Sequence, residues 1–178
     1  MRGLLFAVAV GAALTVVAVP GVGGAAAVLP CRGGDLRATF TLVPGSPGAG
    51  NVVYTLRVRD VGRTCFVTGL PQVTLLTRTG KALPTHVVAA RPGLLTAVRV
   101  VLRPGRYAAA TARFSPDVPG PGETAPGSCE PRATKLRVTS GPGLGATVGP
   151  IRPTTSVCSH GAMSFTGFVA GKTGPPLA

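Results

Sequence analysis

Four cysteines, Cys31, Cys65, Cys129 and Cys158, are the residues whose chemistry this sequence constrains most. An even number of cysteines in an exported chain favours disulfides over free thiols. Zinc ligands usually occur in close pairs such as Cys-x-x-Cys, and this chain has no such pair. The only histidine within four residues of a cysteine is His160. The cysteines therefore predict two disulfides rather than a metal site or a redox pair.

Residues for acid–base or nucleophilic chemistry are scarce: the chain has five acidic residues and two histidines. Asp35 and Asp60 lie near expected strand ends, where a carboxylate commonly caps a turn. Ser159-His160 lacks the Gly-x-Ser-x-Gly turn of a hydrolase nucleophile. Gly171-Lys172-Thr173 resembles the end of a phosphate-binding loop, but Thr166 stands where that loop needs a glycine. We therefore predict no catalytic residue, no cofactor and no metal ligand.

The basic surplus is the feature that points to a function. The chain has 18 Lys and Arg against 5 Asp and Glu, a formal net charge of +13. Arg57 and Arg59 share the polar face of one expected strand, and Lys135 and Arg137 share that of another. Faces of this kind attract anions. We take these four residues as candidate anion-binding residues; the alternative is a solvated basic surface that only reflects an arginine-rich composition.

Aromatic residues narrow the choice of partner. The chain has no Trp, two Tyr and six Phe. Sequence-tolerant binding of single-stranded nucleic acid uses aromatic rings on which bases stack, and sugar-binding grooves use them too. The composition disfavours specific nucleic-acid binding, and the expected partners are an anionic cell-wall polymer, lipid headgroups or an acidic protein.

The N-terminus has the pattern of a signal peptide. Arg2 is the only charged residue before Arg32, residues 4–19 are apolar, and Pro20-Gly21 interrupts them before a run of small residues. A membrane-spanning helix needs about 20 apolar residues, more than this run provides. We predict a signal peptide over residues 1–27, cleaved near Ala27, and a secreted product. Pro30 disfavours lipid attachment at the cysteine that follows it.

Two hairpins must position the cysteines. Residues 36–42 and 52–59 alternate in polarity around the turn 44–50, and residues 134–139 and 146–152 flank the turn 141–145. Facing residues of an antiparallel hairpin share one midpoint. The midpoint of Cys31 and Cys65 lies in the first turn, and that of Cys129 and Cys158 lies in the second. These are the disulfide pairs that we predict, each worth about 3–4 kcal/mol through the loop that it closes.

The rest of the chain also reads as short strands and turns. Further strands are expected near residues 72–78, 84–89, 95–102, 106–114 and 163–169. With 26 Gly and 18 Pro, few long helices are expected. The pattern indicates one all-β domain over residues 28–170, a sandwich or barrel. Residues 115–128 are expected to form a mobile loop and residues 171–178 a disordered tail.

Several short motifs occur in an order that resembles a known family. They include Cys31-x-x-x-Asp35-Leu36, the run 65–71 (Cys-Phe-Val-Thr-Gly-Leu-Pro), Leu102-Arg-Pro-Gly105, Cys129-Glu-Pro131 and the last cysteine, Cys158. Together they resemble the domain of unknown function 4232, found in exported and lipid-anchored actinobacterial proteins. The resemblance covers roughly residues 31–170. It implies an immunoglobulin-like antiparallel β-sandwich outside the cytoplasm and carries over no catalytic residue.

The expected function is that of a secreted, non-enzymatic binding or structural module at the cell envelope, with acidic partners. The alternative is an exported enzyme or enzyme inhibitor that acts through its loops, especially residues 115–128. An arginine-rich face would favour the first, and a cleft joining His86 or His160 to an acidic residue would favour the second.

Overall fold

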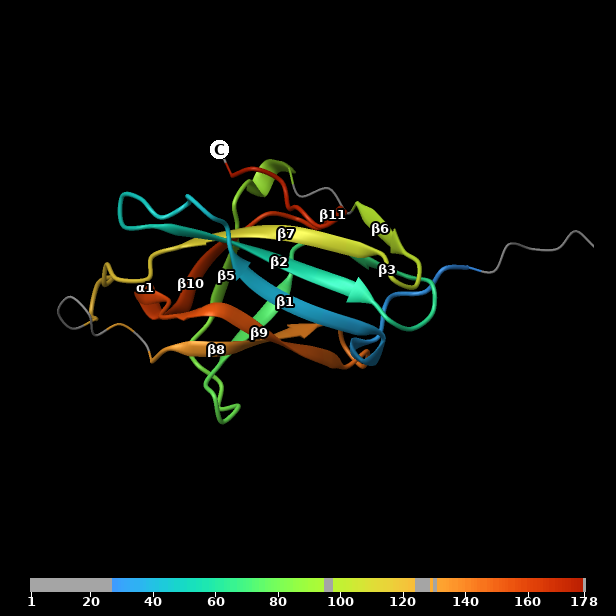
Figure 1. The fold of residues 1–178 in the computed structure, drawn as a ribbon, viewed down its shortest axis with the longest axis horizontal. Coiled ribbons are helices and arrows are strands. Elements are labelled where there is room, and N and C mark those ends of the chain that lie inside the picture. The colour runs from blue at the N-terminus through green and yellow to red at the C-terminus, as the bar shows by residue number, and fades with distance from the viewer. Residues whose placement is uncertain (1–26, 95–97, 124–128, 130, 178) are drawn as a thin grey trace, which may run out of the picture.

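The structure, a computed structural model, describes residues 27–94, 98–123, 129 and 131–177. Strands dominate this part of the chain, and three short helical turns interrupt them (Figure 1). The strands are β1 (Leu36–Leu42), β2 (Val52–Asp60), β3 (Cys65–Thr68), β4 (Gln72–Leu76), β5 (His86–Ala89), β6 (Arg99–Leu102), β7 (Tyr107–Phe114), β8 (Ala133–Thr139), β9 (Ala146–Thr155), β10 (Ala162–Phe165) and β11 (Val169–Ala170). The helical turns are η1 (Gly33–Asp35), η2 (Pro92–Leu94) and α1 (Cys158–Gly161). The all-β class predicted from the sequence is confirmed.

One large curled sheet and one small sheet make up the fold. The large sheet has the order β4-β8-β9-β1-β2-β7-β10-β5, with β11 also paired to β7, and the small sheet is β3-β6. Most neighbours are antiparallel, but β1 pairs with β9, and β5 with β10, in parallel. The sheet is therefore mixed, where the sequence predicted an antiparallel one. Strand alternation sets which face is buried but not the direction of a partner strand, so the sequence missed these two pairings.

The first hairpin follows the predicted register. Each facing pair of β1 and β2 is centred on residue 48, from Leu36 opposite Asp60 to Leu42 opposite Tyr54. The same midpoint applies to Cys31 and Cys65, and the structure joins these two cysteines, 34 residues apart, in a disulfide. The turn between the strands thus fixes the cysteine pairing.

The second hairpin, β8–β9, holds the other disulfide. Cys129 and Cys158 are bonded, as the turn-centred midpoint predicts. A register shift between Ala133 and Lys135 separates the regular part of the hairpin from the end that carries these cysteines. Such a bulge inserts an unpaired residue and bends the strand. Both predicted disulfides are therefore confirmed.

The core lies inside the curl of the large sheet. The apolar residues that alternate along β1 and β2 are buried there, and Phe40 on β1 packs its ring 4.9 Å from that of Tyr54 and 6.0 Å from that of Phe165, centroid to centroid. Residues that alternate with the buried ones along β1 and β2, such as Arg37, Thr39 and Arg59, are exposed. The period-two pattern of the sequence thus separates a core face from an outer face.

The C-terminal region differs from expectation in its detail. The strand expected near 163–169 divides into β10 and β11, and Phe168, which lies between them, is buried. Residues 171–177, expected as a disordered tail, lie along β7: the Thr111 hydroxyl donates a 2.6 Å hydrogen bond to the Pro175 carbonyl. The predicted signal peptide lies outside the described residues, apart from Ala27, as do positions 95–97 of the strand expected at 95–102 and residues 124–128 of the expected loop.

Candidate anion-binding surface

Arg57 and Arg59 lie on the outer face of β2, as the sequence predicts. Arg59 is exposed and Arg57 is half-buried, while Leu56 and Val58 beside them are in the core. Across the hairpin, Arg37 on β1 stands directly opposite Arg59. Two like charges facing each other on neighbouring strands destabilise the pair. Only the register of the two strands places Arg37 beside Arg59.

Lys135 and Arg137 are exposed on the outer face of β8, two residues apart as expected. Strands β9 and β1 lie between β8 and β2, so the two basic pairs are about 14 Å apart at the usual strand spacing. Arg152 on β9 is exposed between them. The structure therefore brings the four predicted residues onto one face of the sheet but not into one site. We define the basic face as Arg37, Arg57, Arg59, Lys135, Arg137 and Arg152.

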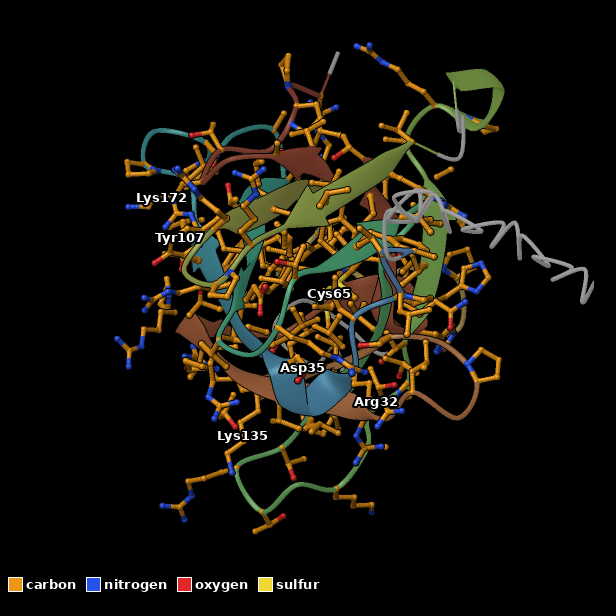
Figure 2. The ribbon with its side chains drawn as sticks, turned by 90° about the vertical axis from the view of Figure 1, so that its right-hand side faces the viewer. Arg32, Asp35, Cys65, Tyr107, Lys135 and Lys172 are labelled. Carbon is orange, nitrogen blue, oxygen red and sulfur yellow. A yellow bond between two sulfur atoms is a disulfide. The ribbon has the colours of Figure 1, made fainter. Side chains whose placement is uncertain are left out.

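A cluster around Tyr107 adjoins the basic face. Tyr107 opens β7 and stands opposite Arg59, whose guanidinium carbon lies 5.8 Å from the ring centroid. The Lys172 ammonium lies 5.0 Å from the same centroid, and Figure 2 shows the two side chains together, on the same side of the molecule as Lys135. Arg57 Nε donates a 2.6 Å hydrogen bond to the Lys172 carbonyl. Sequence reasoning missed Tyr107 and Lys172, because the tail that carries Lys172 was expected to be solvated.

The acidic residues of the described part of the chain do not neutralise this face. Asp60 is fully buried, and its Oδ1 accepts the Gly62 amide at 2.8 Å. Asp35 Oδ2 accepts the Arg32 amide at 3.3 Å, and Glu123 bonds elsewhere. Within the described residues the one carboxylate–base contact within 4.0 Å joins Glu123 to the His160 ring, so no described Lys or Arg has a carboxylate within that distance. The positive charge of the basic face is left for solvent or a ligand to balance.

Glu123 holds a loop against α1. Its carboxylate accepts amide hydrogen bonds from Gly120 (2.7 Å), Ser159 (2.7 Å) and His160 (2.6 Å), and its side chain is only 5% exposed. These bonds, led by that from His160, lower the pKa of Glu123 below its ordinary value. Ser159 and His160 both have positive φ, 53° and 55°, which turns their amides toward one carboxylate. The arrangement ties the 115–123 segment to the end of the sheet.

The same carboxylate lies close to the second disulfide. Ligand atoms of Glu123, Cys129 and Cys158 lie within 4.8 Å of one another, a spacing that could suit a metal ion. The two sulfur atoms are bonded to each other, however, and a disulfide has no thiolate to donate. The carboxylate oxygens already accept three amides. This cluster therefore acts as a structural joint between loop, helical turn and disulfide.

Comparison with known proteins identifies the family of this chain but not its activity. No curated protein matches this chain, and no solved structure does. Among the described residues, no helix has the length and apolar character that crossing a membrane requires. One family model matches residues 31–168, which span both disulfides and ten of the strands described above. The chain therefore belongs to the DUF4232 family, a domain of unknown function.

Proposed function

We propose that this protein is a secreted, non-enzymatic binding module that attaches to anionic material of the cell envelope through the basic face. The two disulfides fit an oxidising compartment outside the cytoplasm. The signal-peptide pattern of residues 1–27 supports export. We also propose that the curled sheet is a variant of the immunoglobulin-like sandwich, in which β3-β6 forms part of the second layer.

The observation that carries this proposal is the pairing of Arg37 with Arg59. The two arginines face each other across β1 and β2, and neither has a carboxylate partner among the described residues. This juxtaposition lowers stability, because like charges repel across a strand pair. An anion bound over both strands would relieve the repulsion. The two arginines therefore favour anion binding but lower the stability of the fold.

The enzyme alternative would rest on His160 and Glu123, whose side chains lie 3.9 Å apart. His160 is 62% exposed, but the carboxylate beside it already accepts three backbone amides. A carboxylate that orients a catalytic histidine instead accepts that histidine's ring N–H at hydrogen-bond distance. The basic face therefore supports the binding function better than this pair supports catalysis.

The test compares two double variants of equal charge. Arg37→Ser/Arg59→Ser removes the facing pair, and Arg32→Ser/Arg91→Ser removes two exposed arginines that lie off the basic face. Binding to vesicles of phosphatidylglycerol and phosphatidylcholine, and to purified anionic wall polymer, is measured for both. Each arginine near an anionic surface contributes about 1 kcal/mol, so the first variant, which loses two, should bind about 30-fold more weakly. The second should bind like the wild type.

The thermal midpoint distinguishes weaker binding that follows from lost arginines from weaker binding that follows from unfolding. Because Arg37→Ser/Arg59→Ser removes a repulsion, its thermal midpoint should equal or exceed that of the wild type. Equal loss of binding in both double variants would show that only net charge matters. Absence of binding to every anionic probe would overturn the proposed function.

A further inference from the structure

A cavity lies where the turn between β6 and β7 meets β11. It has a volume of about 630 Å³, and its lining includes Val101, Arg103, Arg106, Tyr107, Ala170 and Lys172. The residues come from two segments that are far apart in the sequence, 101–107 and 170–172. Arg59 also lies at the edge of the cavity, because its guanidinium lies over the Tyr107 ring. The cavity thus sits at the edge of the basic face, among four cationic side chains.

The backbone around the cavity is held on both sides. On the turn, the Gly105 amide donates to the Asp60 carbonyl (2.8 Å), the Asp60 amide to the Arg106 carbonyl (3.0 Å), and the Arg106 amide to the Arg103 carbonyl (2.9 Å). On the other wall, the Gly171 amide donates to the Tyr107 carbonyl at 2.8 Å. Arg57 Nε donates a hydrogen bond to the carbonyl of Lys172, the residue after Gly171, and so restrains it. A ligand would meet a preformed site, which lowers the entropic cost of binding.

The four cations around the cavity favour an anion with more than one negative charge. Arg59, Arg103, Arg106 and Lys172 repel one another, and none has a carboxylate within 4.0 Å among the described residues. A single carboxylate ligand would balance one of these cations. A phosphate group carries up to two charges and offers several acceptor oxygens, and its geometry suits the planar fork of arginine.

The cavity also offers an apolar surface next to the cations. The Tyr107 ring is half-buried, and Val101, 51% exposed, and Ala170 lie in the same lining. Inorganic phosphate has nothing to place against these groups, whereas the carbon skeleton of a phosphate ester has. We propose that this cavity binds the phosphate group of a phosphate ester, with the ester's carbon skeleton against Tyr107. The inference rests on the proposed function, since it names the anion that the basic face attracts.

The experiment uses small ligands, so that the rest of the basic face contributes little. Isothermal titration of the full mature chain with glycerol phosphate is compared with glycerate, a carboxylate of similar size, at equal ionic strength. We expect glycerol phosphate to bind at least tenfold more tightly. Arg103→Ser/Arg106→Ser should reduce that affinity at least tenfold, whereas Arg32→Ser/Arg91→Ser, which removes equal charge outside both the cavity and the basic face, should leave it within twofold.

A conservative variant tests the role of the ring. Tyr107→Leu keeps the cations and an apolar side chain but removes the aromatic face. It should retain affinity for inorganic phosphate and lose part of the preference for the ester. Thermal melts of every variant show whether it is folded, and a variant that melts early is replaced by the single substitution Arg106→Ser or Lys172→Gln.

A vesicle arm identifies the source of the phosphate. If Arg103→Ser/Arg106→Ser weakens binding to vesicles that contain phosphatidic acid, a phosphate monoester, as well as to glycerol phosphate, the cavity takes a lipid headgroup. If only glycerol phosphate binding weakens, the cavity takes a soluble or polymer-borne ester. Equal affinity for glycerol phosphate in the wild type and this variant would overturn the cavity as the site, even where wall polymer still binds the basic face. Loss of all anion binding would overturn the proposed function too.

Discussion

Asp60 is a fully buried carboxylate at the end of β2, and its two oxygens have different surroundings. Oδ1 accepts the Gly62 amide, while Oδ2 has no hydrogen-bond partner among the described residues. A buried charge without a partner is costly, whereas an amide keeps the acceptor and removes the charge. We expect Asp60→Asn to match or exceed the wild type in free energy of unfolding at neutral pH.

Asp60→Ala is the contrasting variant at this position. It removes the acceptor of the Gly62 amide, and a hydrogen bond to a charged group is worth about 1.5–3 kcal/mol. Urea denaturation of both variants measures the difference. Equal losses in Asp60→Asn and Asp60→Ala would show that the charge of the carboxylate, and not only its acceptor oxygen, stabilises this turn.

Glu123 makes the stability of the fold depend on pH. Its pKa is lowered in the folded protein by the amide hydrogen bonds from His160, Gly120 and Ser159. A lowered folded pKa gives stability that is present above the unfolded value, near 4.5, and is lost as pH falls through the folded pKa. Glu123→Gln should therefore be less stable than the wild type at pH 7, and the gap should shrink below pH 4.5.

Chemical denaturation at neutral and acidic pH measures that gap. Asp117→Asn, a substitution of an exposed residue in the same loop, serves as control. It should change the free energy of unfolding equally at neutral and at acidic pH. A Glu123→Gln gap that stays constant with pH would mean that the carboxylate's charge does not hold the loop to α1.

At the residue scale, the sequence predicted the outward arginines and missed their neighbours. Arg57 and Arg59 alternate with apolar residues, and alternation alone places them on the outer face. The approach of Lys172 to Tyr107 depends on where the tail returns, which no local pattern encodes. The left-handed pair Ser159 and His160 was missed for a similar reason, since non-glycine residues seldom adopt positive φ and carry no turn signature.

At the element scale, hairpins were predictable and parallel pairs were not. The turns at 44–50 and 141–145 join strands that are adjacent in sequence, so the register follows from the turn. The pairing of β1 with β9 joins strands about 100 residues apart and depends on how the whole sheet curls. This is why the disulfides were predicted correctly while the mixed sheet was not.

Gly149 tests the parallel contact between β1 and β9. A Cβ built at this position would overlap the Ala38 carbonyl of β1, so only glycine lets the strands approach this closely. We expect Gly149→Ala to cost about 1–3 kcal/mol, the usual cost of overpacking a buried contact. Gly48→Ala, where a Cβ meets nothing within 4 Å and φ is not positive, should change stability little. Urea denaturation that gives equal losses for the two variants would contradict this pairing.

At the scale of the whole molecule, charge is distributed unevenly. The basic face exposes cations over β8, β9, β1 and β2, while Asp60 and Glu123 are withdrawn from solvent. Net charge was predictable from composition, but which of the cations share the basic face required the strand order. A protein with this distribution should associate through long-range attraction, which added salt screens over about 8 Å at physiological ionic strength.

The dependence of binding on salt tests the central claim most directly. Affinity for an anionic wall polymer is measured over a range of salt concentrations for the wild type and for Arg37→Ser/Arg59→Ser. The logarithm of the binding constant should fall linearly with the logarithm of salt concentration, and the variant's slope should be shallower by about one unit per removed phosphate contact. A binding constant that does not change with salt, or an identical slope for the two proteins, would contradict electrostatic binding through the basic face.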